Sequence, residues 1–140
     1  MGKILCATRG GEASYRTQDA AIALAKEQGD TLVFLYVVDL HFLDKTSAPL
    51  VVDVEGELAK MGTFLLLMAK ERATEQGVAA ETIWREGRVR EVLKQVARET
   101  GASLVVLGRP AGAESAFKLA GLEAFAAEIE AEVGVETRIV

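Results

Sequence analysis

The sequence contains few of the residues that build disulfide, metal or nucleic-acid sites. Only one cysteine occurs among its 140 residues, which excludes a disulfide framework and every metal site that needs several cysteines. The single histidine, His41, lies in an expected loop, where nothing holds a nucleophile on a rigid element for a catalytic triad. Lysine and arginine total 16 against 21 aspartates and glutamates, whereas a nucleic-acid binder needs a concentrated basic stripe. We therefore expect no disulfides, no metal site and no nucleic-acid binding.

Signals for membranes and targeting are also missing. No stretch approaches the roughly 20 apolar residues that span a bilayer. Residues 1–9 contain too few apolar residues and carry a charge too early for a secretory signal, and position 6 lacks the hydroxyl that a myristoylation signal on Gly2 requires. A chain of this length holds one core, because it buries roughly two-thirds of its unfolded surface. We expect one cytoplasmic, globular domain over residues 1–140 that does not associate with membranes.

Apolar residues are present in alternating strand-like and helix-like patterns. The continuous apolar runs at 4–7, 31–38 and 104–107 predict strands that are buried on both faces. The alternating segments at 80–85 and 135–139 predict strands at the edges of a sheet. Helical spacing predicts helices that begin near positions 14, 58, 89 and 122 and stop at the glycines at 29, 77, 101 and 134. Two long connections are expected to be loops, namely 39 to about 52, with Pro49 inside it, and 108–121.

This alternation of strands and helices predicts an α/β fold. Its order favours an open, parallel, five-stranded sheet with strand order 3-2-1-4-5, right-handed crossovers and helices on both faces. In such sheets a ligand binds beyond the carboxyl ends of the strands, at the point where the chain switches sides. Here that point lies between the first and fourth strands, so residues 8–13 and 108–121 are predicted to form the site.

Each of these two loops has a functional and a purely structural interpretation. In the first loop, Gly10 and Gly11 allow the backbone to approach a ligand, and the Arg9 guanidinium suits a phosphate. Alternatively, the glycines only make a tight turn and Arg9 is solvated or pairs with Glu12. The second loop is rich in small residues and contains Arg109, so it either wraps a ligand or is simply an exposed connection.

Three other features have simpler interpretations. Cys6 lies within an apolar strand and is expected to be a buried thiol rather than a nucleophile. Trp84 is expected to pack under a helix or to belong to an interface rather than to serve as a stacking platform. The apolar run at 65–68 is wider than one core face needs, so its helix is either deeply buried or exposes a contact surface. The Walker pattern and the dinucleotide-binding glycine pattern are both absent.

Several segments together resemble the universal stress protein family over nearly the whole chain. Residues 4–14 match the family's first strand, its Asp-Gly-Ser turn and the start of its first helix. Residues 35–39 are similar to its Leu-His-Val-Val-Asp strand end, and 102–108 to its Ala-Asp-Leu-Ile-Val-Met-Gly strand. Gly87 lies where the family has a glycine before the third helix. The resemblance implies a Rossmann-like fold of the HUP type.

The resemblance also implies a nucleotide site, but this chain departs from its motif. ATP-binding members carry G-x2-G-x9-G-[ST] after the fourth strand. The spacing is intact from Gly108 to Gly121, yet Ala111 replaces the second glycine and Leu122 the closing hydroxyl residue. Arg9 replaces the first-loop aspartate that holds the adenosine in such members. Each lost hydrogen bond is worth roughly 1–3 kcal/mol, so affinity is expected to fall about a hundredfold or more.

From this resemblance we expect a stress-response regulator with an eroded adenine-nucleotide site and no catalytic residues. No cofactor is firmly expected, and any binding of ATP or AMP is expected to have low affinity. The site is expected to be lined by eight residues from four segments: Ala7, Arg9, Val37, Leu107, Gly108, Ala111, Gly121 and Leu122.

The resemblance further implies a homodimer formed through the last strand, besides a protein partner that the sequence does not identify. Residues 135–140 support this independently, because they form an uncovered edge without proline. The alternative is that Glu136 and Arg138 are sufficient to keep this edge unpaired.

Two other functions remain open. One is a nucleotide- or anion-sensing switch that uses Arg9 and residues 108–121. The other is a relative of the PP-loop ATP pyrophosphatases, whose Ser-Gly-Gly-x-Asp-Ser turn resembles residues 9–14. Ala13 replaces the aspartate of that turn and Arg9 its first serine, and no substrate-binding domain follows, which disfavours the enzyme.

Overall fold

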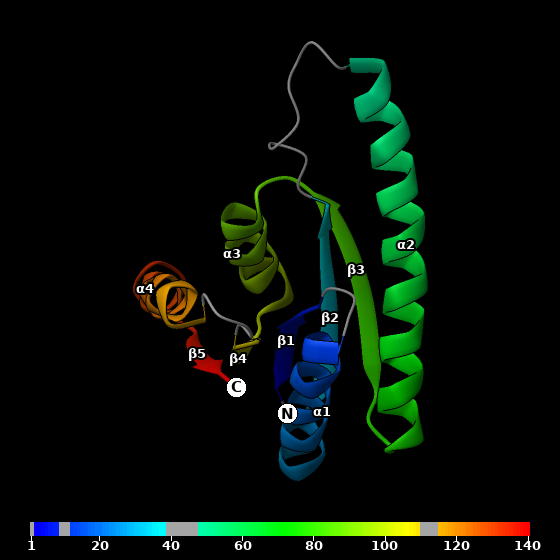
Figure 1. Ribbon diagram of the computed structural model, residues 1–140. Coiled ribbons are helices and arrows are strands. Elements are labelled where there is room, and N and C mark those ends of the chain that lie inside the picture. Colours follow the sequence, from blue (N-terminus) through cyan, green and yellow to red (C-terminus); the bar gives the residue numbers. More distant parts are fainter. Residues whose placement is uncertain (1, 9–11, 39–47, 110–114) are drawn as a thin grey trace.

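The computed structural model describes residues 2–8, 12–38, 48–109 and 115–140 (Figure 1). Within these residues, strands and helices alternate along the whole chain. The elements are β1 (Lys3–Ala7), α1 (Glu12–Gln28), β2 (Thr31–Val38), α2 (Ala48–Glu75), β3 (Ala80–Glu86), α3 (Val89–Thr100), β4 (Leu104–Leu107), α4 (Ser115–Val133) and β5 (Glu136–Ile139).

The strands form one parallel sheet in the order β3-β2-β1-β4-β5. Ile4 of β1 lies opposite Leu32 of β2 on one side and Leu104 of β4 on the other. Helices α1 and α2 cover one face of the sheet, and α3 and α4 cover the other (Figure 1). The predicted fold class and strand order are therefore confirmed.

The core consists of two apolar layers, one on each face of the sheet. Successive residues of the central strands alternate between the layers: Ile4 and Cys6 face α1 and α2, whereas Leu5 faces α3 and α4. All three side chains are fully buried, as expected for parallel strands that are covered on both faces.

Half-buried and exposed residues alternate along most of β3 and along β5, as predicted for edge strands. The interpretation of Trp84 needs a closer look. Along β3, Ile83 is half-buried, but Trp84 is 45% exposed. Trp84 is therefore not fully packed under a helix, and its other interpretation, as part of an interface, stays a prediction. Its side chain lies on the outermost strand of the sheet.

Two predicted loops are shorter than expected because the following helices begin earlier. Helix α2 begins at Ala48, not after position 52, and Pro49 lies in its first turn, where a missing N–H costs no helical hydrogen bond. Helix α4 begins at Ser115, so residues 115–121 are helical rather than part of the loop 108–121. Alanine, leucine and lysine dominate this stretch, and their helix propensity outweighs its resemblance to a small-residue loop.

Candidate functional site

The predicted switch point lies between β1 and β4. These two strands are hydrogen-bonded neighbours, with Cys6 opposite Val106. After β1 the chain continues to α1 on one face of the sheet, and after β4 it continues to α4 on the other face (Figure 1). The residues that follow the two strands, beginning with Thr8 and Gly108, therefore start at the same edge of the sheet.

Four predicted site residues meet in one core layer near this edge. Ala7, Val37 and Leu107 lie at or next to the ends of their strands and face α3 and α4. Leu122 of α4 packs against the same layer. Leu107 is buried and the other three are half-buried. The structure thus brings these four together mainly as packing residues.

The remaining predicted residues are placed differently. Gly121 is exposed in α4, and a Cβ built on it meets no atom within 4 Å. Arg9 and Ala111 lie outside the described residues.

Gly108 has a structural reason to be glycine. A Cβ at this position would lie 2.3 Å from Oγ1 of Thr17 and 3.3 Å from its Cβ. Helix α1 therefore approaches the end of β4 so closely that only a residue without a side chain fits.

A buried polar group lies beside this contact and was missed from the sequence. Thr8, Thr17 and Gln18 are only 3%, 4% and 3% exposed. Nε2 of Gln18 donates a hydrogen bond of 2.7 Å to Oγ1 of Thr8, while Oε1 of Gln18 is buried without a partner. The signal was available, because Thr17 and Gln18 lie four residues before the buried Ala21 and Ile22 on the same helix face.

Two exposed arginines join α1 to the segment after β4. Nη2 of Arg16 donates a hydrogen bond of 3.0 Å to the carbonyl oxygen of Arg109. The backbone N–H of Arg109 donates to the carbonyl oxygen of Val140 at 2.9 Å. Within the described part of the chain, neither guanidinium takes part in an ion pair. This edge therefore carries positive charge in a protein whose net charge is −5.

The single cysteine has no nucleophilic character in this structure. Cys6 is fully buried in β1, and burial raises the pKa of its thiol to about 12. Desolvation disfavours the thiolate, which is the reactive form. The prediction of a buried thiol is confirmed.

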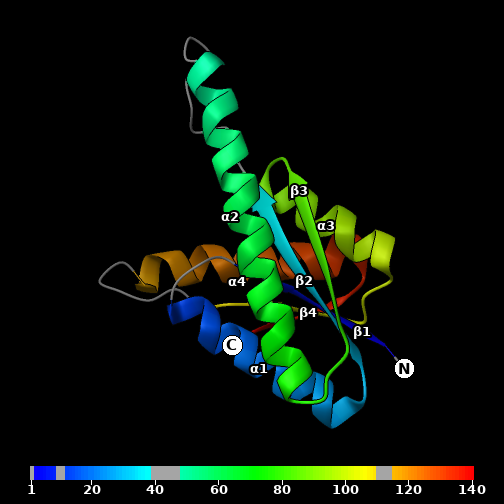
Figure 2. The same ribbon diagram turned by 90° about the vertical axis from the view of Figure 1, so that its right-hand side faces the viewer.

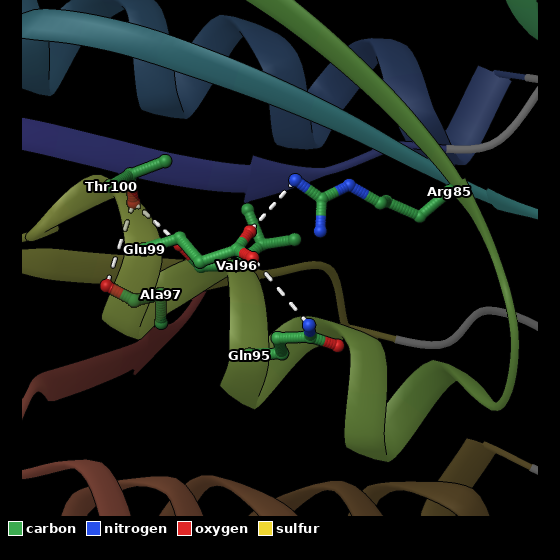
Figure 3. A network of polar contacts seen from close by, with 6 residues as sticks. All are labelled: Arg85, Gln95, Val96, Ala97, Glu99 and Thr100. Carbon is green, nitrogen blue, oxygen red and sulfur yellow. Dashed lines mark hydrogen bonds and ion pairs between the residues drawn. The ribbon is translucent and has the colours of Figure 1, made fainter.

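A second polar network lies on the other face of the sheet and has a structural role (Figure 3). Arg85 of β3 forms an ion pair of 2.7 Å with Glu99 of α3. Gln95 reaches the same carboxylate at 3.5 Å, and the Thr100 hydroxyl donates to the carbonyl oxygen of Val96 at 2.7 Å. The Arg85–Glu99 pair joins the edge strand to α3, whereas the contacts of Gln95 and Thr100 lie within that helix.

Among the described residues, no cluster of histidine, cysteine, aspartate and glutamate could hold a metal ion. No helix in the same part of the chain is long and apolar enough to cross a bilayer.

Comparison with known proteins gives consistent matches in sequence and in structure. The sequence matches the model of the Universal stress protein family over residues 1–133. It is 35% identical over 124 residues to universal stress protein YxiE of Bacillus subtilis strain 168, and the match covers 77% of this chain and 78% of that protein.

Solved structures share the fold along nearly the entire chain. A universal stress protein family member from Burkholderia pseudomallei is 28% identical, with a TM-score of 0.74 and coverage of 99% of this chain and 95% of that one. UspA from Lactobacillus plantarum is 16% identical, with a TM-score of 0.81 and coverage of 99% and 97%. A family protein from Arabidopsis thaliana with AMP bound is 14% identical, with a TM-score of 0.69 and coverage of 100% and 91%.

Proposed function

The chain belongs to the universal stress protein family, and from that premise we propose that it is a cytoplasmic, non-enzymatic, homodimeric regulator with an eroded adenine-nucleotide site. It acts by binding a protein partner rather than by catalysis. The relative from Arabidopsis thaliana was solved with AMP bound, so the question for this chain is which parts of a nucleotide site it retains.

The observation that carries the proposal is the early start of α4. Only the first four N–H groups of a helix lack partners inside it, and these are the groups that bind phosphate. Gly121 and Leu122 are the seventh and eighth residues of α4, which begins at Ser115. Their N–H groups are therefore used within the helix, and the Leu122 side chain packs into the core. The last two positions of the motif cannot contact a phosphate in this arrangement.

Gly108 supports the same conclusion. In a nucleotide-binding loop, a glycine lets a ligand approach the backbone closely. Here the close approach at Gly108 is made by Thr17 of the same chain, at 2.3 Å from the position of a Cβ. The first glycine of the motif is thus explained by internal packing.

Isothermal titration with ATP and with AMP tests the proposal directly. We expect no binding in the low micromolar range, because the aspartate, the hydroxyl and the unpaired N–H groups are all absent from the positions of the motif. A low-micromolar dissociation constant for either nucleotide would overturn the eroded site. The double variant Ala111→Gly, Leu122→Ser restores the motif's side chains. It should still bind weakly, because its helix continues to use the N–H groups.

The lack of catalysis is tested by a phosphate- and pyrophosphate-release assay with ATP and Mg²⁺. We expect release no faster than in buffer. Turnover that is lost on substitution of Arg9 would favour the PP-loop alternative instead.

The homodimer is proposed to form through β5. This strand ends the sheet and pairs only with β4 among the described strands. The N–H of Thr137 points away from β4 and donates to the Glu130 carboxylate at 3.2 Å rather than to a strand. Thr137→Pro removes this outward donor and leaves the ladder to β4 intact, so it should convert the dimer to a monomer in light scattering. Thr137→Val keeps the N–H and should remain dimeric.

A second candidate function, anion sensing, is favoured by the pair Arg16 and Arg109. The fold places both at the switch point, and they form no ion pair within the described residues. An arginine fork suits a phosphate group. If the site binds inorganic pyrophosphate, Arg9→Ala and Arg16→Ala should each weaken binding in a titration. Arg98→Ala on α3 should leave it unchanged, and unchanged isotherms for all three would exclude this function.

A further inference from the structure

Strand β3 forms the edge of the sheet opposite β5, and among the described strands it pairs only with β2. Figure 2 looks toward this side of the molecule, and β3 is visible along its length beside α2. Glu81 and Thr82 are exposed, and Trp84 is 45% exposed. Residues 80–86 contain neither proline nor lysine, two residue types that commonly keep an edge strand unpaired. The outer side of β3 can therefore accept another strand.

The register of β3 on β2 determines which backbone groups point outward. The N–H of Gly87, directly after the strand, donates to the carbonyl oxygen of Val38 at 3.0 Å. Along a strand, successive residues direct their backbone groups to opposite sides. Gly87 bonds inward and lies four residues after Ile83, so Ile83 bonds inward as well. The N–H and C=O groups of Thr82 and Trp84 therefore point away from β2, toward the open side of the edge.

The charges of β3 are complementary to the same strand in antiparallel orientation. Glu81 and Arg85 lie two residues before and after Ile83, and all three share one face of the strand. In an antiparallel pair centred on Ile83, each Glu81 lies opposite Arg85 of the second copy. A pair centred on position 81 or 85 would place like charges opposite each other. A pair centred on 82 or 84 would leave both charges without an opposite charge, so the sequence favours the centre at Ile83.

We propose that β3 pairs with β3 of a second copy of this chain, antiparallel and about a two-fold axis at Ile83. Thr82 then exchanges both backbone hydrogen bonds with Trp84 of the second copy, because the outward groups of these residues meet in that register. Cross-strand pairs of opposite charge stabilise an antiparallel ladder. The two-fold axis makes each contact twice. The two sheets thus join into one continuous sheet across the pair.

The ion pairs within one copy leave both charged side chains accessible. Arg85 pairs with Glu99 at 2.7 Å and Glu81 with Lys3 at 3.6 Å, yet the side chains of Arg85 and Glu81 are 38% and 56% exposed. A guanidinium has several N–H donors, so Arg85 can bond a second carboxylate beside that of Glu99. Exposed ion pairs contribute little free energy. The association is therefore weak and reversible, and its population rises with protein concentration.

This contact is separate from the proposed β5 contact, because β3 and β5 are opposite edges of the sheet. Two different two-fold contacts at opposite edges join copies in a row, so the native chain should form species larger than a dimer at high concentration. Thr137→Pro, which blocks β5, should be monomeric at low concentration and should dimerise through β3 as concentration rises. If β5 is not an interface, the native chain and Thr137→Pro should associate equally, and the β3 contact can still be measured.

Charge reversal tests the contact and its register by sedimentation velocity in the Thr137→Pro background. Glu81→Arg places two guanidinium groups opposite each other and Arg85→Glu two carboxylates, so each variant alone should associate about tenfold more weakly than the parent. An equimolar mixture of the two variants brings opposite charges together and should recover the association. Glu123→Arg, the same change of charge at an exposed site on α4, should associate like the parent. Circular dichroism confirms that each variant is folded.

Trp84 is the only tryptophan of the sequence, so its fluorescence reports on the contact itself. Pairing brings Thr82 of the second copy beside the exposed part of the indole ring, and the emission should therefore shift to shorter wavelength as the concentration of Thr137→Pro rises. Thr82→Pro removes an outward N–H and should abolish both the association and the shift. Thr82→Val keeps this N–H and should retain both.

Three results would overturn the proposal. The first is a Thr137→Pro chain that stays monomeric at all micromolar concentrations. The second is a mixture of the charge-reversal variants that associates no better than each variant alone. The third is association that leaves the Trp84 emission unchanged, because the two copies would then meet elsewhere. The same charge reversals in the native chain, measured as growth beyond the dimer, give the answer without the proline variant.

Discussion

At the scale of single residues, Gly108 is the position where α1 packs closely against the end of β4. In Gly108→Ala the new methyl group would lie 2.3 Å from Oγ1 of Thr17. Thr17 is buried and β-branched, so it has few alternative rotamers. We expect a loss of about 1–3 kcal/mol in the free energy of unfolding, measured by urea denaturation.

The same substitution in a Thr17→Ala background serves as the control. Removing the hydroxyl and methyl groups of Thr17 makes room for the alanine at 108, so most of the loss should disappear. An equal loss in both backgrounds would mean that the backbone at 108, rather than the contact, requires glycine.

Predictions for single residues were accurate where the surrounding sequence segment alone determines whether the residue is buried. The burial of Cys6 follows from its apolar neighbours alone. The contact between Arg16 and the Arg109 carbonyl joins positions 93 residues apart, and no local pattern encodes such a meeting. Trp84 shows the same limit, because its exposure depends on how far a helix reaches over the last strand.

At the scale of secondary-structure elements, ion pairs join α3 to α4, and Lys94 makes two of them. Nζ of Lys94 lies 2.6 Å from the Glu128 carboxylate and 2.5 Å from that of Glu132. Hydrogen bonds to the two glutamates raise the pKa of Lys94 above its ordinary value, and the hydrogen bond from Lys94 lowers the pKa of Glu128. Lys94 and Glu128 therefore each favour the charged form of the other.

The direction of these shifts predicts how Lys94→Met responds to pH. A lowered carboxyl pKa stabilises the fold above the unfolded value of 4.5, and this contribution is lost as pH falls through the folded value. Lys94→Met should therefore have a lower melting temperature than the wild type at neutral pH, and this difference in melting temperature should disappear in acid. Thermal unfolding of both proteins from neutral to acidic pH measures this difference. Arg98→Met on the same helix should show no such closing gap, and a gap of constant size would exclude the ion pair as its cause.

The sequence predicted the elements themselves better than their ends. Alternation of apolar runs and helical stripes was enough to identify every strand and helix in order. The starts of α2 and α4 were missed because Pro49 and Gly121 look like loop residues. Pro49 is tolerated because it lies in the first turn of α2, and Gly121 because tertiary packing already stabilises α4.

At the scale of the whole molecule, the strand order follows from the sequence because parallel strands with short right-handed crossovers leave few arrangements. The switch point could be located by the same logic, since the chain leaves the neighbouring strands β1 and β4 at the same edge of the sheet. The side-chain contacts around this switch point could not be predicted from the sequence to the same extent. Whether a glycine faces a ligand or a threonine of its own chain depends on packing between α1 and β4, which sequence spacing does not report.

The open edge of the sheet gives the last prediction. The Glu130 carboxylate accepts a hydrogen bond from the N–H of Thr137 on β5, and this satisfies a group that a second β5 strand would otherwise use. An occupied edge resists pairing, so Glu130→Ala should strengthen the proposed dimer several-fold. Glu123→Ala, an exposed site on the same helix, should leave the dimer unchanged. Sedimentation equilibrium of the wild type and the two variants measures the dissociation constant of each dimer. Equal dissociation constants would mean that two copies do not meet at β5.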